Sequence, residues 1–101
     1  MRFQVQFIGN YMTKINIKEI DLSTYKVIVT DAHVTTHEVT VNWGYALSLT
    51  ASKISTEQLI NNAFEFLLAR ESNASILRNF ELSQIGLYFP EFEETMRKQL
   101  T

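Results

Sequence analysis

The spacing of hydrophobic residues changes at about residue 55, and this change limits the folds that the chain can adopt. Before it, apolar and polar residues alternate, as in Ile15 and Ile17 with Lys14, Asn16 and Lys18 between and around them. After it, apolar residues recur at three- and four-residue intervals, which is the spacing of an amphipathic helix. Strands followed by helices are typical of the α+β class. The sequence therefore predicts a small antiparallel sheet packed against a main helix at about 55–71 and two or three short C-terminal helices.

The strand half contains one strong hairpin signal. Residues 25–31 and 34–41 are rich in β-branched residues and are joined by a short polar connection, which predicts two antiparallel strands. A further strand is predicted over residues 2–8, followed by a tight turn at 9–10. Residues 43–49 are expected to extend or follow the hairpin, with Gly44 as a bulge or bend.

The helical half has recognisable start signals. Ser55-Thr56-Glu57-Gln58 fits a capping box, so we expect the main helix to begin there and to stop near Glu71. Residues 75–80 and 82–89 are predicted as short helical segments.

The only proline of the chain stands in a strongly apolar corner. Pro90 suits the first position of a last helix, where its missing N–H has no cost. Ile85, Phe89 and Phe92 are expected to point under the sheet, whereas Tyr88 should face outward. The corner is therefore predicted to be mainly structural, with one contact residue on its rim.

Composition excludes several classes of function. The chain has 101 residues, which is enough for a single domain over 1–101. It has no cysteine, so disulfides and thiolate metal sites are excluded, and we expect a cytoplasmic protein. With a net charge of −2 and no dense basic cluster, nucleic acid is not an expected partner. No apolar run approaches the roughly 18 residues of a membrane span, and no glycine-rich loop indicates a cofactor.

Three separated motifs resemble a known family. They are Phe-Glu-Phe-Leu-Leu-Ala-Arg-Glu at 64–71, Ser-Ile-Leu at 75–77 and Tyr-Phe-Pro at 88–90. In this order they resemble a family of small bacterial proteins, many from cyanobacteria, to which no activity is assigned. The resemblance covers roughly residues 25–94, leaves residues 1–14 outside, and departs from the family's loops near Lys53 and Ser72. It implies a shared fold and no catalytic role.

The two histidines are the candidates for a metal site. His33 and His37 share strand parity with Asp31, and imidazole and carboxylate are ligands that zinc prefers. However, strand residues four positions apart are separated by roughly 13 Å, which is too far to share one ion. We therefore interpret them as a solvent-exposed hairpin face and assign no metal, with His33 and His37 kept as weak candidates.

Arg70, Arg78 and Tyr88 are the candidates for contact with a ligand or partner. Arg70 lies at the end of the predicted main helix and is expected to bond its last free carbonyl groups. Arg78 is expected to pair with Glu71 or Glu81. The alternative is that Arg70 and Arg78 hold an anionic group together.

Two functions remain open at this point. The aromatic content and the lack of a catalytic motif favour a non-enzymatic module that binds a protein or self-associates, for example as a homodimer through a sheet edge. The alternative is a small-molecule-binding protein or enzyme with a pocket between the sheet and residues 70–92.

Overall fold

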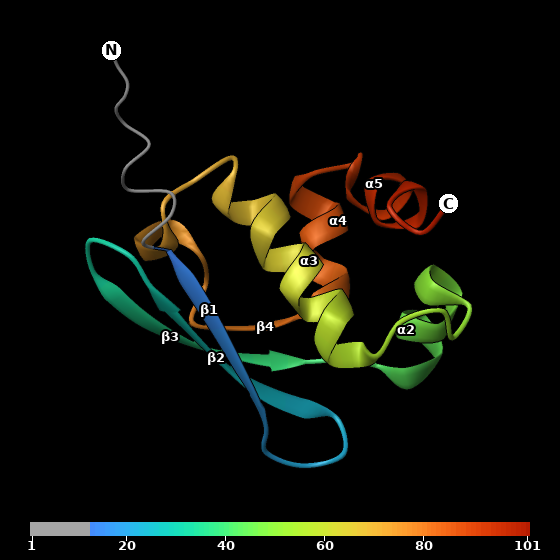
Figure 1. The fold of residues 1–101 in the computed structure, drawn as a ribbon, viewed down its shortest axis with the longest axis horizontal. Coiled ribbons are helices and arrows are strands. Elements are labelled where there is room, and N and C mark those ends of the chain that lie inside the picture. Colours follow the sequence, from blue (N-terminus) through green and yellow to red (C-terminus); the bar gives the residue numbers. More distant parts are fainter. Residues whose placement is uncertain (1–12) are drawn as a thin grey trace.

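The computed structural model describes residues 13–101, so the strand predicted over 2–8 and the turn at 9–10 lie outside the described part. The described residues form an α+β fold in which strands precede most of the helices, as predicted (Figure 1). The strands are β1 (Lys14–Glu19), β2 (Thr24–Thr30), β3 (Val34–Thr40) and β4 (Asn79–Glu81). The helices are α2 (Trp43–Thr50), α3 (Thr56–Leu68), α4 (Ile85–Tyr88) and α5 (Phe92–Lys98), with 3-10 turns η1 (Asn73–Ser75) and η2 (Leu82–Gln84).

The sheet has the strand order β1-β2-β3-β4. Its first three strands are antiparallel neighbours, with Val27 opposite both Ile17 and His37, so the predicted hairpin is confirmed. β4 pairs with β3 in parallel and places Phe80 opposite Val39. The prediction of a helical segment over 75–80 is therefore wrong at residues 79 and 80, because pairing with a distant strand outweighs the local pattern.

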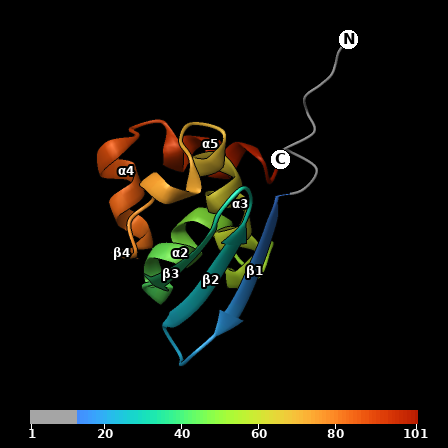
Figure 2. The ribbon, with the colours of Figure 1, turned by 90° about the vertical axis from the view of Figure 1, so that its left-hand side faces the viewer.

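The core lies between one face of the sheet and α3 (Figures 1 and 2). Alternate residues of β2 and β3 are buried, as the period-two pattern requires. From α3 the core receives its apolar stripe, which consists of Leu59, Ile60, Ala63, Phe64, Phe66 and Leu67. Hydrophobic burial of this stripe is the main force that holds the helix on the sheet.

The segment 43–49 follows the hairpin as a helix, so the alternative that it extends the hairpin is wrong. Asn42 is the reason: its side-chain oxygen accepts a hydrogen bond from the Tyr45 amide at 2.9 Å and so caps the start of α2. Gly44 is accommodated within this helix instead of forming a bulge. The helix ends at Ala51, which adopts a left-handed conformation with φ of 50°.

The predicted main helix is confirmed, but only one of the two hydrogen bonds of the predicted capping box is formed. The Ser55 hydroxyl accepts from the Gln58 amide at 3.0 Å, but the Gln58 side chain donates to Asn62 instead of returning to Ser55. α3 ends at Leu68, before the predicted end at Glu71.

The proline corner differs from the prediction in its details. Because α5 begins at Phe92, Pro90 is not its first residue but belongs to a turn closed by the Phe92 amide and the Phe89 carbonyl at 2.9 Å. Phe89 and Phe92, which were expected to point under the sheet, pack their rings on Phe66 of α3. Tyr88 is exposed, as predicted.

Candidate functional site

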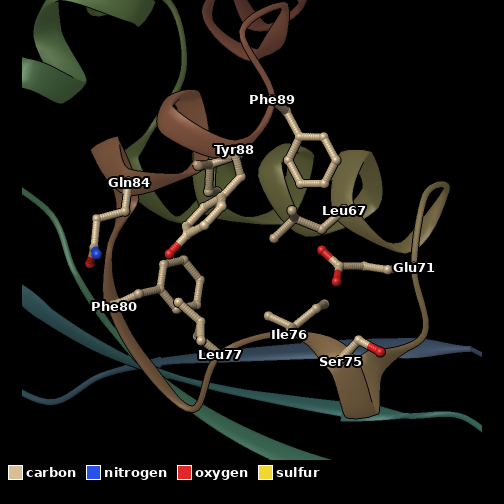
Figure 3. A pocket seen from close by; sticks show the side chains of 10 residues that line it. Leu67, Glu71, Ser75, Ile76, Leu77, Phe80, Gln84, Tyr88 and Phe89 are labelled. Atoms are coloured by element: carbon tan, nitrogen blue, oxygen red, sulfur yellow. The ribbon is translucent and has the colours of Figure 1, made fainter.

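An open cavity of about 260 Å³ lies between the C-terminal part of α3, the segment 75–77, β4 and α4 (Figure 3). Its walls are mostly apolar. The lining residues are Leu67, Glu71, Ser75, Ile76, Leu77, Phe80, Gln84, Ile85, Tyr88 and Phe89. These residues come from five separate elements, so the cavity exists only in the folded chain.

The cavity is formed because α3 ends at Leu68 and the chain is extended again at Ile76. After Leu68 the chain turns through η1, and Ile76 is already in extended conformation before β4. The buried side chain of Asn73 fixes this loop, because its amide nitrogen donates to the His33 carbonyl at 2.9 Å. The loop is therefore fastened to the β2–β3 turn, and a gap remains between it and α4.

His37 of β3 fixes the same loop through a hydrogen bond. Its side chain is fully buried, and its Nδ1 lies 2.7 Å from the carbonyl oxygen of Leu77, which can only accept. Nδ1 therefore donates, and Nε2 accepts from the Thr35 hydroxyl at 2.8 Å. Burial lowers the pKa of His37, and the positive charge of Arg78 acts in the same direction, whereas the bond to Leu77 opposes it. The neutral ring of His37 thus holds the backbone at Leu77, which lines the cavity, and we call it the His37 brace.

The expectation that both histidines share a solvent-exposed face is wrong for His37. His33 is exposed in the turn, whereas His37 lies on the core side with Val39. The parity of His37 with the apolar Val39 and Val41 was the sequence signal for this placement. Within residues 13–101, no three histidine, aspartate, glutamate or cysteine side chains gather as they must to hold a metal ion.

Arg70 lies outside the cavity and covers Phe66. Its Nη1 donates to the Phe66 carbonyl at 2.9 Å, as predicted for a cap of the main helix. Its guanidinium carbon is 3.5 Å from the centre of the Phe66 ring, and its Nε is 3.4 Å from a carboxylate oxygen of Glu91. Arg70 is therefore held by structural contacts.

The structure does not bring the three candidate contact residues together. Tyr88 lines the cavity and is 65% exposed, whereas neither Arg70 nor Arg78 is among the lining residues. Arg78 is exposed, and its backbone carbonyl accepts from the Glu38 amide at 2.7 Å beside β3.

Glu71 has a place that the sequence did not indicate. Its carboxylate points into the cavity between the side chains of Leu67 and Ile76 (Figure 3). The ion pairs found within residues 13–101 join Arg70 to Glu91 and Lys98 to Glu94, so Arg78 forms the expected ion pair with neither Glu71 nor Glu81. The cavity therefore combines an apolar wall with one negative charge.

A second apolar surface lies on α2. Trp43 is 76% exposed, and Leu47, one helical turn later, is partly exposed beside it. Both line a shallow hollow of about 200 Å³ together with Ala46, Thr50, Ser52, Ile54, Ser55 and Thr56. We call Trp43 and Leu47 the α2 knob.

Comparison of the chain with protein-family models, with curated proteins and with solved structures found no match. None of the helices formed by residues 13–101 has the length and apolar character needed to cross a membrane.

Proposed function

We propose that this domain is a non-enzymatic protein-interaction module and that its cavity receives an apolar side chain of another protein molecule. The observation that carries the proposal is the combination of an open apolar cavity with exposed apolar groups on its rim, namely Leu77 at 47% and Tyr88 at 65% exposure. Apolar surface left in contact with water is commonly covered by a partner. Tyrosine is among the residues that contribute most binding energy at such contacts.

A small-molecule-binding protein or enzyme is the second candidate, and it is supported by a cavity whose lining residues, from Leu67 to Phe89, overlap the segment 70–92. Its volume of about 260 Å³ is below the roughly 300–1,000 Å³ of typical ligand pockets. The histidine nearest its wall, His37, uses both ring nitrogens in hydrogen bonds to the protein. Size and chemistry thus favour a protein side chain over an enclosed metabolite.

Pairing of sheet edges is a less favourable route to a homodimer. Among residues 13–101, β1 lies at one edge of the sheet, and antiparallel pairing of two copies centred on Asn16 would place Lys14 directly opposite Lys18. Like charges directly opposite each other destabilise a strand pair. We therefore place the interaction surface at the cavity.

Affinity capture with matched baits tests the proposed function. The wild-type domain, Leu77→Asp and Leu87→Asp are each used to capture proteins from an extract of the source cells. Leu87 is 79% exposed and does not line the cavity, so its variant controls for added surface charge. We expect a bound protein, either a partner or tagged copies of this chain, to be retained by wild type and Leu87→Asp and lost from Leu77→Asp. Equal retention by both variants would contradict the proposal.

A further inference from the structure

We propose that the occupant of the cavity is Trp43 of a second copy of this chain. This inference rests on the proposed function and names its partner. It follows from three properties of the described residues, which are the exposure of the α2 knob, the size of the cavity and the charge beside each surface.

The α2 knob has the composition of an interface anchor. Trp43 is the first residue of α2 and is 76% exposed, although tryptophan is a residue that proteins usually bury in large part. Leu47 stands one turn later on the same side of the helix and widens the apolar surface. Tryptophan is strongly enriched among the residues that dominate binding energy.

The cavity is large enough for an indole ring. An apolar cavity of roughly 150 Å³ is sufficient to bind benzene, and this one measures about 260 Å³. Phe80, Tyr88 and Phe89 line it, so an entering ring would meet aromatic side chains. Offset or edge contacts between such rings add to the gain from burial.

The charges beside the two surfaces are complementary. Glu71 points its carboxylate into the cavity (Figure 3), and Lys53 is exposed between Ser52 and Ile54, which line the same hollow as Trp43. When the knob of one copy enters the cavity of another, the Lys53 ammonium can approach the Glu71 carboxylate. A charge pair of this kind fixes the orientation of docking more than it adds affinity.

One molecule cannot fill its own cavity. Ile54 and Thr56, beside the α2 knob, lie at the start of α3, whereas Leu67 and Glu71 lie at its end. At 1.5 Å per residue these groups are roughly 20 Å apart along the helix. The contact is therefore between molecules and joins two different surfaces of the chain.

The contact area of one tryptophan, one leucine and their surroundings is small for a protein interface. Interfaces at the low end of the size range form weak, reversible complexes. We therefore expect self-association with a dissociation constant of about 10 µM to 1 mM.

Fluorescence measures the contact directly, because Trp43 is the only tryptophan of the chain. Between concentrations of about 10 µM and 1 mM, the emission of wild type should shift to shorter wavelength as the indole leaves water. Leu87→Asp should show the same shift, whereas Leu77→Asp should keep the emission of an exposed indole at all concentrations. The proposal is overturned if wild type shows no shift or if both variants behave alike.

Mixing two defective variants tests whether the knob of one molecule meets the cavity of another. Trp43→Asp removes the knob, and aspartate is favourable at the start of a helix, so α2 should persist. Leu77→Asp disables the cavity. Each variant should sediment as a monomer alone, and the mixture should form a complex, since it contains one intact knob and one intact cavity. A mixture that remains monomeric while wild type associates would overturn the assignment.

The ion pair is tested by charge exchange. Glu71→Lys and Lys53→Glu should each weaken association by about three- to tenfold, and the double variant should recover most of the wild-type affinity. Lysine is acceptable at the end of α3, because a cation there is favoured by the helix dipole. A double variant weaker than both single variants would contradict the pairing of Glu71 with Lys53.

Failure of self-docking can be distinguished from failure of the proposed function. If wild type stays monomeric up to about 1 mM, self-docking is wrong. Capture with the bait Trp43→Asp then distinguishes the two proposals. If this bait captures a host protein and the double variant Trp43→Asp/Leu77→Asp does not, the proposed interaction module is still supported. If no bait captures a protein, both self-docking and the proposed interaction module are wrong.

Discussion

Phe66 and Leu67 are neighbours near the end of α3, yet their surroundings are opposite. The ring of Phe66 lies 5.2 Å from that of Phe92, centre to centre, and the Arg70 guanidinium covers it at 3.5 Å. We call this the closed flank of α3. Leu67 instead faces the cavity beside Glu71 and Leu77, which we call the open flank. The same helix thus has one flank covered by aromatic side chains and the other flank facing the cavity.

The difference between the flanks follows from what the chain places next to each. A turn at Pro90 returns the aromatic residues of the corner to Phe66. On the other side, Asn73 and His37 hold the loop against the hairpin and away from α4. The cavity is therefore maintained by hydrogen bonds to two buried polar side chains, which are less common in cores than apolar ones.

The largest effect is expected from truncation on the closed flank. Phe92 is fully buried, so Phe92→Ala should lower the free energy of unfolding by about 3–5 kcal/mol. Leu77→Ala, on the open flank, should lower it by less than about 1 kcal/mol, because Leu77 is 47% exposed. Denaturant titration of both variants measures the comparison, and equal losses would show that the two flanks do not differ in this way.

The next effect concerns pH and the His37 brace. Because burial lowers the pKa of His37, the folded protein takes up its proton at lower pH than the unfolded chain does. The stabilisation from the neutral ring is complete above the ordinary pKa of 6.5 and is lost as the pH falls through 6.5 toward the folded value. Between pH 7.5 and 5, the free energy of unfolding should fall by up to about 1.4 kcal/mol per pH unit.

His33 supplies the matched control for this pH dependence, since it is exposed in the turn. His33→Gln should keep the pH dependence of wild type. His37→Gln should be less stable at pH 7.5, and most of the pH dependence of its stability should be lost. The same pH dependence in His37→Gln as in wild type would show that His37 is not its source.

A smaller effect is expected from Arg70 on the closed flank. Arg70→Gln removes the guanidinium from the Phe66 ring and its bond to the Phe66 carbonyl, which should cost about 1–2 kcal/mol. Glu91→Gln removes only the half-exposed ion pair with Arg70 and should cost about 0–1 kcal/mol. Thermal unfolding of the two variants gives the comparison, and a larger loss from Glu91→Gln would mean that the ion pair, and not the ring contact, holds Arg70.

Much of the layered fold was predictable from the sequence, because periodicity determines which side of an element is buried. The hairpin was predicted from the alternation in residues 25–31 and 34–41. The helix that covers it was predicted from the apolar stripe of α3. The errors have local causes. A single side chain, Asn42, caps α2 at 43–49, where an extension of the hairpin was one of the two expectations.

The candidate site was less predictable, because it depends on tertiary pairing. The parallel pairing of Val39 with Phe80 makes residues 79–81 a strand. Because 75–80 were predicted to be helical, the position of Leu77 in the cavity lining was not predicted. Tyr88 was correctly placed outward by its spacing from Ile85. The direction of the Glu71 carboxylate depends on where α3 ends, which no local pattern determined.

The most direct test of the division between flanks is methyl NMR of the wild-type domain at increasing protein concentration. The methyl resonances of Leu67, Ile76 and Leu77 on the open flank should move progressively, while that of Met96 in α5, which is buried away from the cavity lining, should stay in place. Movement confined to other surfaces, or none on the open flank up to the limit of solubility, would contradict the account.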